Sequence, residues 1–201
     1  MEKARLWAVE WEQGGEKLTA FEPTDDELRR AAPELAASYN DSHNRVMMGH
    51  DDEPHTAADV IAYYEQLRTE GGRPFLLYMD GVLMGDADFR NIAASTGEFA
   101  IMIGGRASQG RGLGTRFALM LHLFGYEVLG LERIYISVIP ANAASRRLFE
   151  KLGYQLDDSP AARELIDEET DLTMSLARSA FDRTRIGDHA AIRAFERPPP
   201  V

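Results

Sequence analysis

The chain has 201 residues, of which 44% are hydrophobic and 27% charged, and its formal net charge is −11. This composition is typical of a globular protein with a real core, and the negative charge argues against a nucleic-acid partner because nucleic-acid phosphates would be repelled. The sequence contains no cysteine, which excludes disulfides, thiolate metal ligands and a cysteine nucleophile.

Two further features indicate where the protein acts and on what. The N-terminal stretch MEKARLWAVEWEQ lacks the apolar core of a signal peptide, and no run approaches the roughly 20 apolar residues of a membrane span. The sequence therefore predicts a cytoplasmic protein that does not contact membranes. Its acidity slightly favours a cationic substrate such as an amine, through electrostatic steering.

The first 40 residues predict a strand followed by a helix. Residues 6–11 (LWAVEW) have strand character and are followed by a glycine turn. A helix is expected to begin at Thr24, because Glu27 stands in the capping-box position three residues later. Pro33 is expected to kink this helix or to split it in two.

The next segment predicts a loop and then a second helix. Residues 43–55 (HNRVMMGHDDEPH) show no clear period and are expected to form a loop. A helix should begin at Thr56, with Asp59 in the capping-box position, and should end at Gly71.

The second half of the chain predicts a mixed sheet with helices. Asp80-Gly81 joins two apolar runs and is the strongest short hairpin signal in the sequence. The expected elements that follow are a strand at 97–105, a helix at 112–130, a strand at 133–139, a helix at 142–153 and a strand at 171–177. Antiparallel pairing early and a parallel β-α-β crossover later predict an α/β fold with one mixed sheet. The domain is expected to span 1–178, and 179–201 to be an appendage that is partly disordered or packs on a second subunit.

The stretch SQGRGLGTRF (108–117) is rich in glycine and arginine and opens a predicted helix. A nucleotide P-loop fails because Arg111-Gly112 stands where Lys and a hydroxyl residue are needed. A dinucleotide fingerprint fails because Gly110, Gly112 and Gly114 are spaced two apart. A glycine turn without a ligand and a pyrophosphate cradle of backbone N–H groups stay open. The cradle is favoured because Arg106, Arg111 and Arg116 flank it and no acid occurs from 99 to 126.

The segment Gln109-Gly110-Arg111-Gly112-Leu113-Gly114 resembles the Q/R-x-x-G-x-G/A signature of the GNAT superfamily of acetyl-CoA-dependent N-acyltransferases. EFAIMIGGRASQGRGLGT looks like the branch with ribosomal-protein N-terminal and spermidine acetyltransferases, and VIPANAASRRLFEKLGY resembles its second cofactor segment. The resemblance covers roughly residues 75–176. It implies a mostly antiparallel sheet with a bulged, splayed strand pair, and acetyl-CoA as co-substrate without a metal.

The resemblance also implies roles for particular residues. Backbone groups of Met102, Ile103 and Gly104 would bind the pantetheine arm of acetyl-CoA, and Asn142 would contact the cofactor near its thiol end. The pyrophosphate would lie on the N–H groups of Gln109, Gly110, Arg111, Gly112, Leu113, Gly114 and Thr115. Arg146 or Arg147 either reaches the adenosine phosphate or belongs to a solvated helix face.

Glu98 is the predicted catalytic base, which would take a proton from the amine, usually through water. It stands at the start of the splayed strand, where several members of the family carry a base; the alternative is a glutamate at the strand edge facing solvent. Many members place a tyrosine where this chain has Phe149, so the group that protonates the departing thiolate is open, with Ser145 and Tyr154 as weaker candidates.

Other polar residues have plainer interpretations. His43, His50 and His55 with Asp51, Asp52 and Glu53 do not have the spacing of a tight metal site, so a solvated loop is expected. His122 is expected on a helix face. Asp86 and Asp88 alternate along a strand and face either solvent or a cationic acceptor.

The sequence thus predicts an N-acetyltransferase that moves an acetyl group from acetyl-CoA to a primary amine by direct attack in a ternary complex. The acceptor would be a small amine or a protein N-terminus, and a homodimer is possible. The alternative is a non-catalytic acyl-CoA-binding module with a sensing or regulatory role, which Phe149 keeps open.

Overall fold

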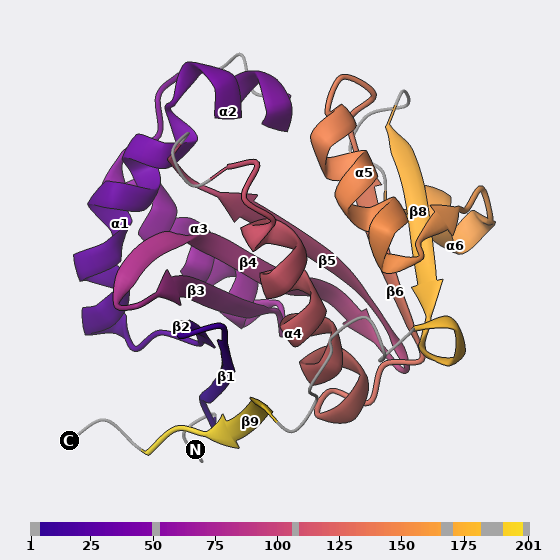
Figure 1. Cartoon of the computed structure of the whole chain (residues 1–201). Helices are drawn as coiled ribbons and strands as arrows, with labels where there is room; N and C mark the ends of the chain where they lie inside the picture. The colour runs from indigo at the N-terminus through magenta and orange to yellow at the C-terminus, as the bar shows by residue number, and fades with distance from the viewer. Residues whose placement is uncertain (1–4, 50–52, 106–108, 166–170, 182–190, 199–201) are drawn as a thin grey trace.

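The computed structural model describes residues 5–49, 53–105, 109–165, 171–181 and 191–198. These residues form one nine-stranded sheet with helices on both faces (Figure 1). The strands are β1 (Trp7–Gln13), β2 (Glu16–Phe21), β3 (Arg73–Met79), β4 (Val82–Ala93), β5 (Thr96–Ile103), β6 (Arg133–Val138), β7 (Gln155–Leu156), β8 (Leu172–Ala177) and β9 (Ile192–Glu196). The helices are α1 (Asp25–Tyr39), α2 (Ser42–Met48), α3 (Ala57–Thr69), α4 (Leu113–Glu127), α5 (Ala143–Leu152) and α6 (Pro160–Arg163).

The sheet is mixed and mostly antiparallel, which confirms the predicted fold class. The strand order is β7-β8-β6-β5-β4-β3-β2-β1-β9. Neighbouring strands pair antiparallel except β5 and β6, which are parallel because α4 returns the chain across the sheet between them. None of the helices in the described ranges has the length and apolar character needed to cross a membrane.

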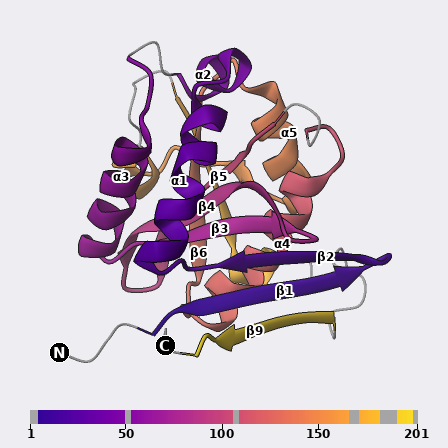
Figure 2. The same cartoon turned by 90° about the vertical axis from the view of Figure 1, so that its left-hand side faces the viewer.

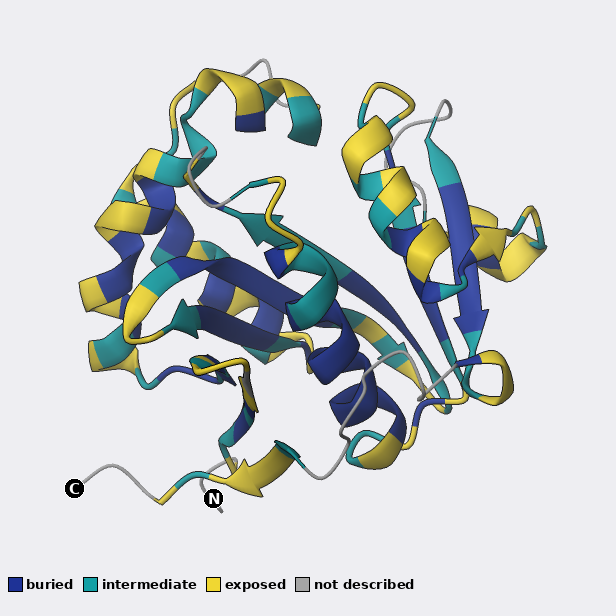
Figure 3. Ribbon diagram, viewed as in Figure 1, coloured by how far each residue is buried: buried dark blue, intermediate teal, exposed yellow. Residues whose placement is uncertain are grey.

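Two cores lie on the two faces of the sheet. The larger core gathers α4 and α5 against the sheet, with Phe89, Phe117 and Phe124 among its buried rings. The smaller core joins α1 and α3 to the opposite face through Leu35, Tyr64 and other buried side chains. Burial is concentrated along the sheet-facing sides of these helices (Figure 3).

The capping boxes and the hairpin predicted from the sequence are confirmed. The side chains of Thr24 and Thr56 each accept a hydrogen bond from the backbone N–H of the third helical residue. The carboxylates of Glu27 and Asp59 accept in turn from the backbone N–H of the cap residue. Asp80 and Gly81 have φ of 49° and 81°, the left-handed pair that a two-residue hairpin requires between β3 and β4.

Two predictions for the N-terminal third were wrong. Strand β2 was not anticipated, although Gly14 and Gly15 form the turn of a β1–β2 hairpin. Within the predicted loop 43–55, residues up to Met48 belong to α2, which Asp41 caps by accepting bonds from the two backbone N–H groups at 43 and 44. Residues 50–52 lie outside the described part.

Pro33 was expected to kink the first helix or to split it in two, and the helix is not split there. Helix α1 continues through Pro33 to Tyr39, and the chain turns at Asn40 and Asp41 instead. Pro33 is exposed, so its ring points away from the sheet and costs α1 one internal hydrogen bond without disturbing the packed face.

Part of the segment predicted as an appendage belongs to the sheet. Residues 192–196 form β9, which pairs with β1 over five residue pairs, so the first and last strands lie side by side (Figure 2). Phe181 is also buried, against His122 and Tyr126 of α4. Residues 182–190 and 199–201 lie outside the described part, and packing of this segment on a second subunit stays a prediction.

Arg197 fastens the chain just after β9 to the start of α1. Its guanidinium donates two bonds to the Glu27 carboxylate, at 2.6 and 2.9 Å, and one to the carbonyl oxygen of Glu22. It also lies 4.6 Å from the centroid of the Phe21 ring. Burial raises the pKa of Glu27, but the bonds from Arg197 and Thr24 outweigh it and lower that pKa to about 2.

Arg197→Ala should lower the free energy of unfolding by about 1–2 kcal/mol at pH 7. Because the folded-state pKa of Glu27 is depressed, its contribution is full above its ordinary pKa near 4.5 and is lost as the pH falls toward 2. Urea unfolding of both proteins at pH 7 and pH 3 should show the gap narrowing at low pH. Arg193→Ala, which removes a 67% exposed side chain near β1, is the matched control and should change little. A gap that is the same at both pH values would contradict the ion-pair explanation.

Candidate functional site

The parallel pair β5–β6 separates after three residue pairs. Thr96, Gly97 and Glu98 pair with Arg133, Ile134 and Tyr135, and no pair follows in the described strands. Beyond this point the two strands diverge (Figure 1). On its other edge, β5 stays paired with β4 as far as Ile103. Backbone groups of residues 99–103 that point away from β4 therefore have no strand partner. They belong to alternate residues, because neighbouring residues of a strand direct their N–H and C=O groups to opposite edges. Of the predicted residues, Ile103 has its carbonyl oxygen bonded to the Gln109 side chain, not to β4.

The glycine segment after β5 opens α4 with bare backbone N–H groups. Gly110 and Gly112 have φ of 73° and 77°, and a Cβ at either position would meet nothing within 4 Å. Gly112 is the N-cap of α4, no side chain in the described part caps it, and the first turn contains no acid. The N–H groups of Leu113, Gly114 and Thr115 are therefore left for a ligand, and the helix dipole favours an anion there.

Two other glycines let neighbouring elements approach this segment. A Cβ on Gly104 would lie 2.5 Å from Oγ of Ser38, at the end of α1. A Cβ on Gly114 would lie 2.8 Å from Cδ1 of Leu148 on α5. A side chain at position 104 would require Ser38 and the end of α1 to move, whereas one at position 114 would require the end of the Leu148 side chain to move.

Helix α2 is bonded to both predicted cofactor segments. Nε2 of Gln109 donates to Oδ1 of Asn44 at 2.8 Å and to the carbonyl oxygen of Ile103 at 3.0 Å. Nδ2 of Asn142 donates to the carbonyl oxygen of Met47 at 2.9 Å, while its Oδ1 caps α5 by accepting from the N–H of Ser145. The structure thus brings Gln109 and Asn142 to one short helix from opposite sides of the divergence.

The arginines that were predicted to offset the cofactor phosphates do not all lie beside the glycine segment. Arg116 pairs with Glu16 at 2.6 Å and lies over the Trp11 ring, so it faces the β1–β2 hairpin. The guanidinium of Arg111 is exposed and is 4.0 Å from the same glutamate, which leaves it near the glycine segment. On α5, Arg146 pairs with Glu150 of its own helix, and Arg147 is exposed. Arg106 lies outside the described residues.

Glu98, the predicted base, is held in an ion pair. Its carboxylate accepts from Nη2 of Arg90 at 2.7 Å and from Nδ2 of Asn91 at 2.8 Å, and the residue is 2% exposed. It therefore does not face solvent at a strand edge. Both oxygens are already bonded at the closed end of the β5–β6 divergence, which makes Glu98 poorly placed to receive a proton from a substrate.

Asp86 and Asp88, which alternate along β4 and were expected to face either solvent or a cationic acceptor, do not face solvent. Both are buried on the face covered by α1 and α3, opposite Met102 and Ala100 of β5. Oδ2 of Asp86 accepts a short bond from Tyr39 and a 3.1 Å bond from Tyr64. Asp88 accepts at 3.4 Å from Tyr63, and its Oδ1 is buried without a partner.

Burial sets the charge of these two carboxyls. It raises the pKa of Asp86 to about 6, against the opposing effect of the two tyrosine bonds. It raises the pKa of Asp88 to about 7, where Arg90 opposes the rise and Asp86 and Glu98 add to it. Asp88 therefore changes its protonation near neutral pH, as a proton acceptor should.

Of the two candidates for protonating a leaving group, Ser145 is half-buried and Tyr154 is buried. The Tyr154 hydroxyl is 2.6 Å from Nε2 of His122, whose Nδ1 lies 2.6 Å from the carbonyl oxygen of Ala118. That carbonyl only accepts, so Nδ1 carries the hydrogen and Nε2 accepts from Tyr154. Burial lowers the pKa of His122 to about 4, and Phe149 packs 5.2 Å from the Tyr154 ring. His122 was expected on a helix face but is fully buried.

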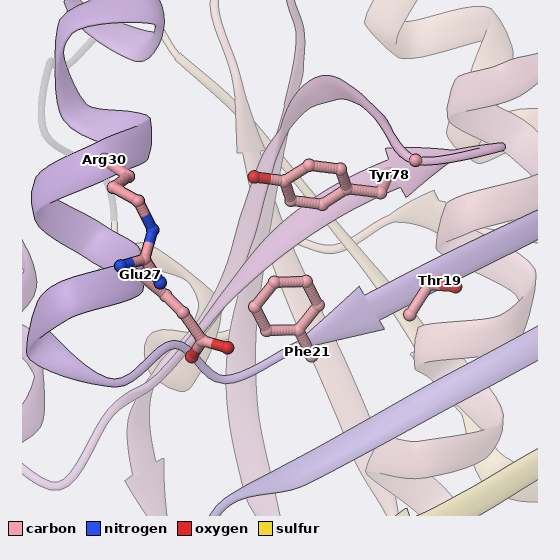
Figure 4. Close-up of a pocket in the computed structure, with 6 residues that line it drawn as sticks. Thr19, Phe21, Glu27, Arg30 and Tyr78 are labelled. Atoms are coloured by element: carbon pink, nitrogen blue, oxygen red, sulfur yellow. The ribbon is translucent and has the colours of Figure 1, made fainter. Parts of the chain in front are cut away.

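Among the residues that the structure describes, no three His, Asp or Glu side chains are grouped so that they could hold a metal ion. His43 is exposed on α2, whereas the backbone of His55 is bonded to the Asn40 side chain. His50, Asp51 and Asp52 lie outside the described residues. An open pocket elsewhere, between α1 and the β2–β3 part of the sheet, contains none of the predicted site residues (Figure 4); its lining is Thr19, Phe21, Glu27, Arg30, Tyr78 and Gly81.

Comparison with known proteins agrees with this geometry. The model of the acetyltransferase (GNAT) domain matches residues 18–155, so the chain belongs to the GNAT acetyltransferase family. It is 28% identical over 121 residues to spermidine N(1)-acetyltransferase of Escherichia coli (strain K12), a match covering 58% of this chain and 64% of that protein, which is less than two thirds of its length.

Two solved structures share the fold. One is Mycobacterium smegmatis RimJ in complex with CoA-disulfide, with a TM-score of 0.69 and 18% identity over 86% of this chain and 88% of that one. The other is AAC(6')-Ib in complex with ribostamycin and coenzyme A, with a TM-score of 0.69 and 21% identity over 84% of this chain and 97% of that one.

Glu98→Gln should lower the free energy of unfolding by about 2 kcal/mol, because Arg90 loses a mostly buried charged partner. Urea unfolding measures the loss. Glu150→Gln, which breaks the exposed pair with Arg146, is the control and should have little effect. A Glu98→Gln protein as stable as the wild type would contradict a structural role for this carboxylate.

Proposed function

We propose that this chain is an N-acetyltransferase that transfers the acetyl group of acetyl-CoA to a primary amine, by direct attack in a ternary complex. The observation that carries the proposal is the uncapped first turn of α4, opened by left-handed Gly112, beside the unpaired edge of β5. Bare N–H groups at a helix N-terminus suit a pyrophosphate, and an unpaired strand edge suits an amide-containing arm.

The residues present fit acetyl-CoA, which supplies an acetyl thioester as the electrophile. The N–H groups of 109–115 would hold the pyrophosphate, with the exposed Arg111 offsetting its charge. Backbone groups of Met102, Ile103 and Gly104 would bind the pantetheine arm, although the carbonyl oxygen of Ile103 would first have to release Gln109. Asn142 would keep its cap on α5 and exchange its bond to Met47.

Four facts support an amine as the acceptor. The chain carries a net charge of −11, and buried carboxyls of β4 lie one strand away from the unpaired edge of β5. The curated relative is named as a spermidine acetyltransferase, and one structural neighbour is solved with an aminoglycoside. A small amine and a protein N-terminus both offer a primary amino group, so both belong to the proposed acceptor class.

A non-catalytic CoA-binding protein is the second candidate. The observation that favours it is the missing acid: Phe149 is buried in the aromatic cluster, and the Tyr154 hydroxyl is bonded to His122. A thiol has a pKa near 8.5, so its thiolate can leave without a protein acid, and this observation does not exclude catalysis. The two candidates agree on CoA binding and differ in turnover.

Thr115→Glu should abolish CoA binding without destabilising the protein. A carboxylate in the first turn of α4 complements the helix dipole but repels the pyrophosphate. In a thermal shift assay, saturating CoA should raise the melting temperature of the wild type by several degrees and leave that of Thr115→Glu unchanged. Thr115→Gln, similar in size and uncharged, is the control and should keep most of the shift.

Two outcomes decide between the candidates. If CoA does not shift the wild-type melting temperature, the glycine segment is a turn without a ligand and the proposal fails. If CoA binds but no primary amine is acetylated in a thiol-release assay with acetyl-CoA, the non-catalytic module is the better description.

A further inference from the structure

Asp88 and Arg116 are the two residues in the described part of the chain with buried side-chain polar atoms that have no hydrogen-bond partner, and Asp88 is the acidic one. The residue is 8% exposed, and its Oδ1 is buried without a hydrogen-bond partner, while Oδ2 accepts one long bond from Tyr63. A buried carboxyl oxygen without a donor is costly unless a donor arrives from outside the fold. Asp86, two residues earlier, differs because Tyr39 and Tyr64 both donate to it.

The strand register places Asp88 next to the unpaired edge of β5. Its partner across the β4–β5 ladder is Ala100, two residues beyond Glu98, where pairing with β6 ends. Ala100 is half-buried, whereas the residues before it, Glu98 and Phe99, are buried. Its methyl group is the smallest side chain available there apart from hydrogen, so Ala100 adds little bulk between Asp88 and the unpaired edge.

The groups around Asp88 favour a cation. Asp86 on the same strand and Glu98 on β5 are acids, and Tyr63 of α3 is neutral, because burial raises its pKa. Arg90 is the one cation that acts on Asp88 among the described residues, and its guanidinium is bonded to Glu98 and to the Tyr63 hydroxyl. Tyr39 of α1 and Tyr64 of α3 complete the surroundings through Asp86. One ammonium group would offset part of the remaining negative charge.

We propose that Oδ1 of Asp88 receives the ammonium group of the acceptor and takes its proton, and that the acceptor is an unbranched primary alkylamine. This proposal rests on the proposed acetyltransferase function and names its acceptor site. An ammonium at the end of an unbranched chain fits the approach over Ala100, whereas the α-amine of a protein N-terminus sits on a substituted carbon.

The proton balance of this step is complete. The alkylammonium gives one proton to Asp88, and the free amine then forms a C–N bond with the acetyl carbon while the C–S bond breaks. The second proton passes from the nitrogen to the departing thiolate, which becomes the thiol of CoA. Asp88 returns its proton to solvent, so each turnover releases one proton. The raised pKa of Asp88, about 7, makes it a stronger base than an ordinary aspartate.

The test compares Asp88→Asn with the wild type, using n-butylamine as acceptor. We expect kcat/KM to fall at least 100-fold, with the thermal shift by CoA unchanged. The wild-type kcat/KM should rise with pH through about 7, and the residual activity of the variant should lack this rise. Asp157→Asn, at the edge of the sheet beside Ser175, is the matched control and should keep full activity.

A second measurement does not depend on turnover. Butylammonium without acetyl-CoA should raise the melting temperature of the wild type and not that of Asp88→Asn, whereas butyltrimethylammonium, which has no N–H, should shift neither. Ala100→Leu should block access to Asp88 while leaving that aspartate unchanged. This variant should therefore lose n-butylamine turnover and keep the rise in melting temperature caused by CoA. This variant covers the case in which Asp88→Asn fails to fold.

The failures of the two proposals are distinguishable. If the wild type acetylates n-butylamine but Asp88→Asn and Ala100→Leu both stay within threefold of it, the acceptor site is elsewhere and the acetyltransferase function stands. Preference for a peptide N-terminus over n-butylamine overturns the proposed acceptor class. If the wild type neither binds CoA nor turns over, the acetyltransferase function fails, and butylammonium binding alone then decides whether Asp88 is a cation site.

The folded state should also report the charge of Asp88. Because its folded-state pKa is raised above the ordinary 3.8, its stabilising contribution is present below about pH 4 and is lost as the pH rises through 7. The melting temperature of Asp88→Asn relative to the wild type should therefore increase from pH 4 to pH 8. A difference that is independent of pH would show that Asp88 is already ionised across this range and would contradict the strong burial on which the proposal depends.

Discussion

The early end of the pairing between β5 and β6 is the constraint on which the rest of the molecule depends. Three residue pairs hold the two strands together, and beyond Glu98 and Tyr135 they separate. Separation frees one edge of β5 and places the N-termini of α4 and α5 on opposite sides of the opening (Figure 1). A sheet that stayed paired would satisfy its own backbone and leave nothing for an extended ligand to bond. The fold therefore lacks backbone hydrogen bonds between β5 and β6 beyond this point, and this edge of β5 is available to an extended ligand.

Polar side chains on the α1–α3 face of the sheet divide into two kinds. Glu98 is satisfied by Arg90 and Asn91 and reinforces the closed end of the opening, so its burial is structural. Asp88 is buried two residue pairs further along the β4–β5 ladder, and its Oδ1 has no hydrogen-bond partner. The two carboxyl groups, on neighbouring strands, thus differ in their surroundings. Glu98 has a guanidinium partner, whereas one oxygen of Asp88 has no hydrogen-bond partner. Helix α3, through Tyr63, links the two environments.

Local sequence signals predicted the fold better than they predicted the site. The capping boxes at Thr24 and Thr56 are decided by residues three positions apart, so they are visible in the sequence and confirmed in the structure. Strand β2 and helix α2 were missed because each is short and is fixed by its neighbours. Glu98 resembled a base by its position in a motif, but its partner Arg90 lies across a strand pair that no local pattern reveals. The same holds for Asp88, whose burial depends on α3 packing over β4.

The pairing of β9 with β1 has a consequence for how the chain is made. Arg197 contacts Glu27 across 170 positions, and β9 adds to a strand that begins at Trp7. During synthesis β1 therefore emerges long before its outer neighbour exists, and its edge is exposed to other strands in the meantime. Contacts of such long range also form slowly. A nascent chain held short of β9 would be the form of this protein most prone to pair with another copy of itself.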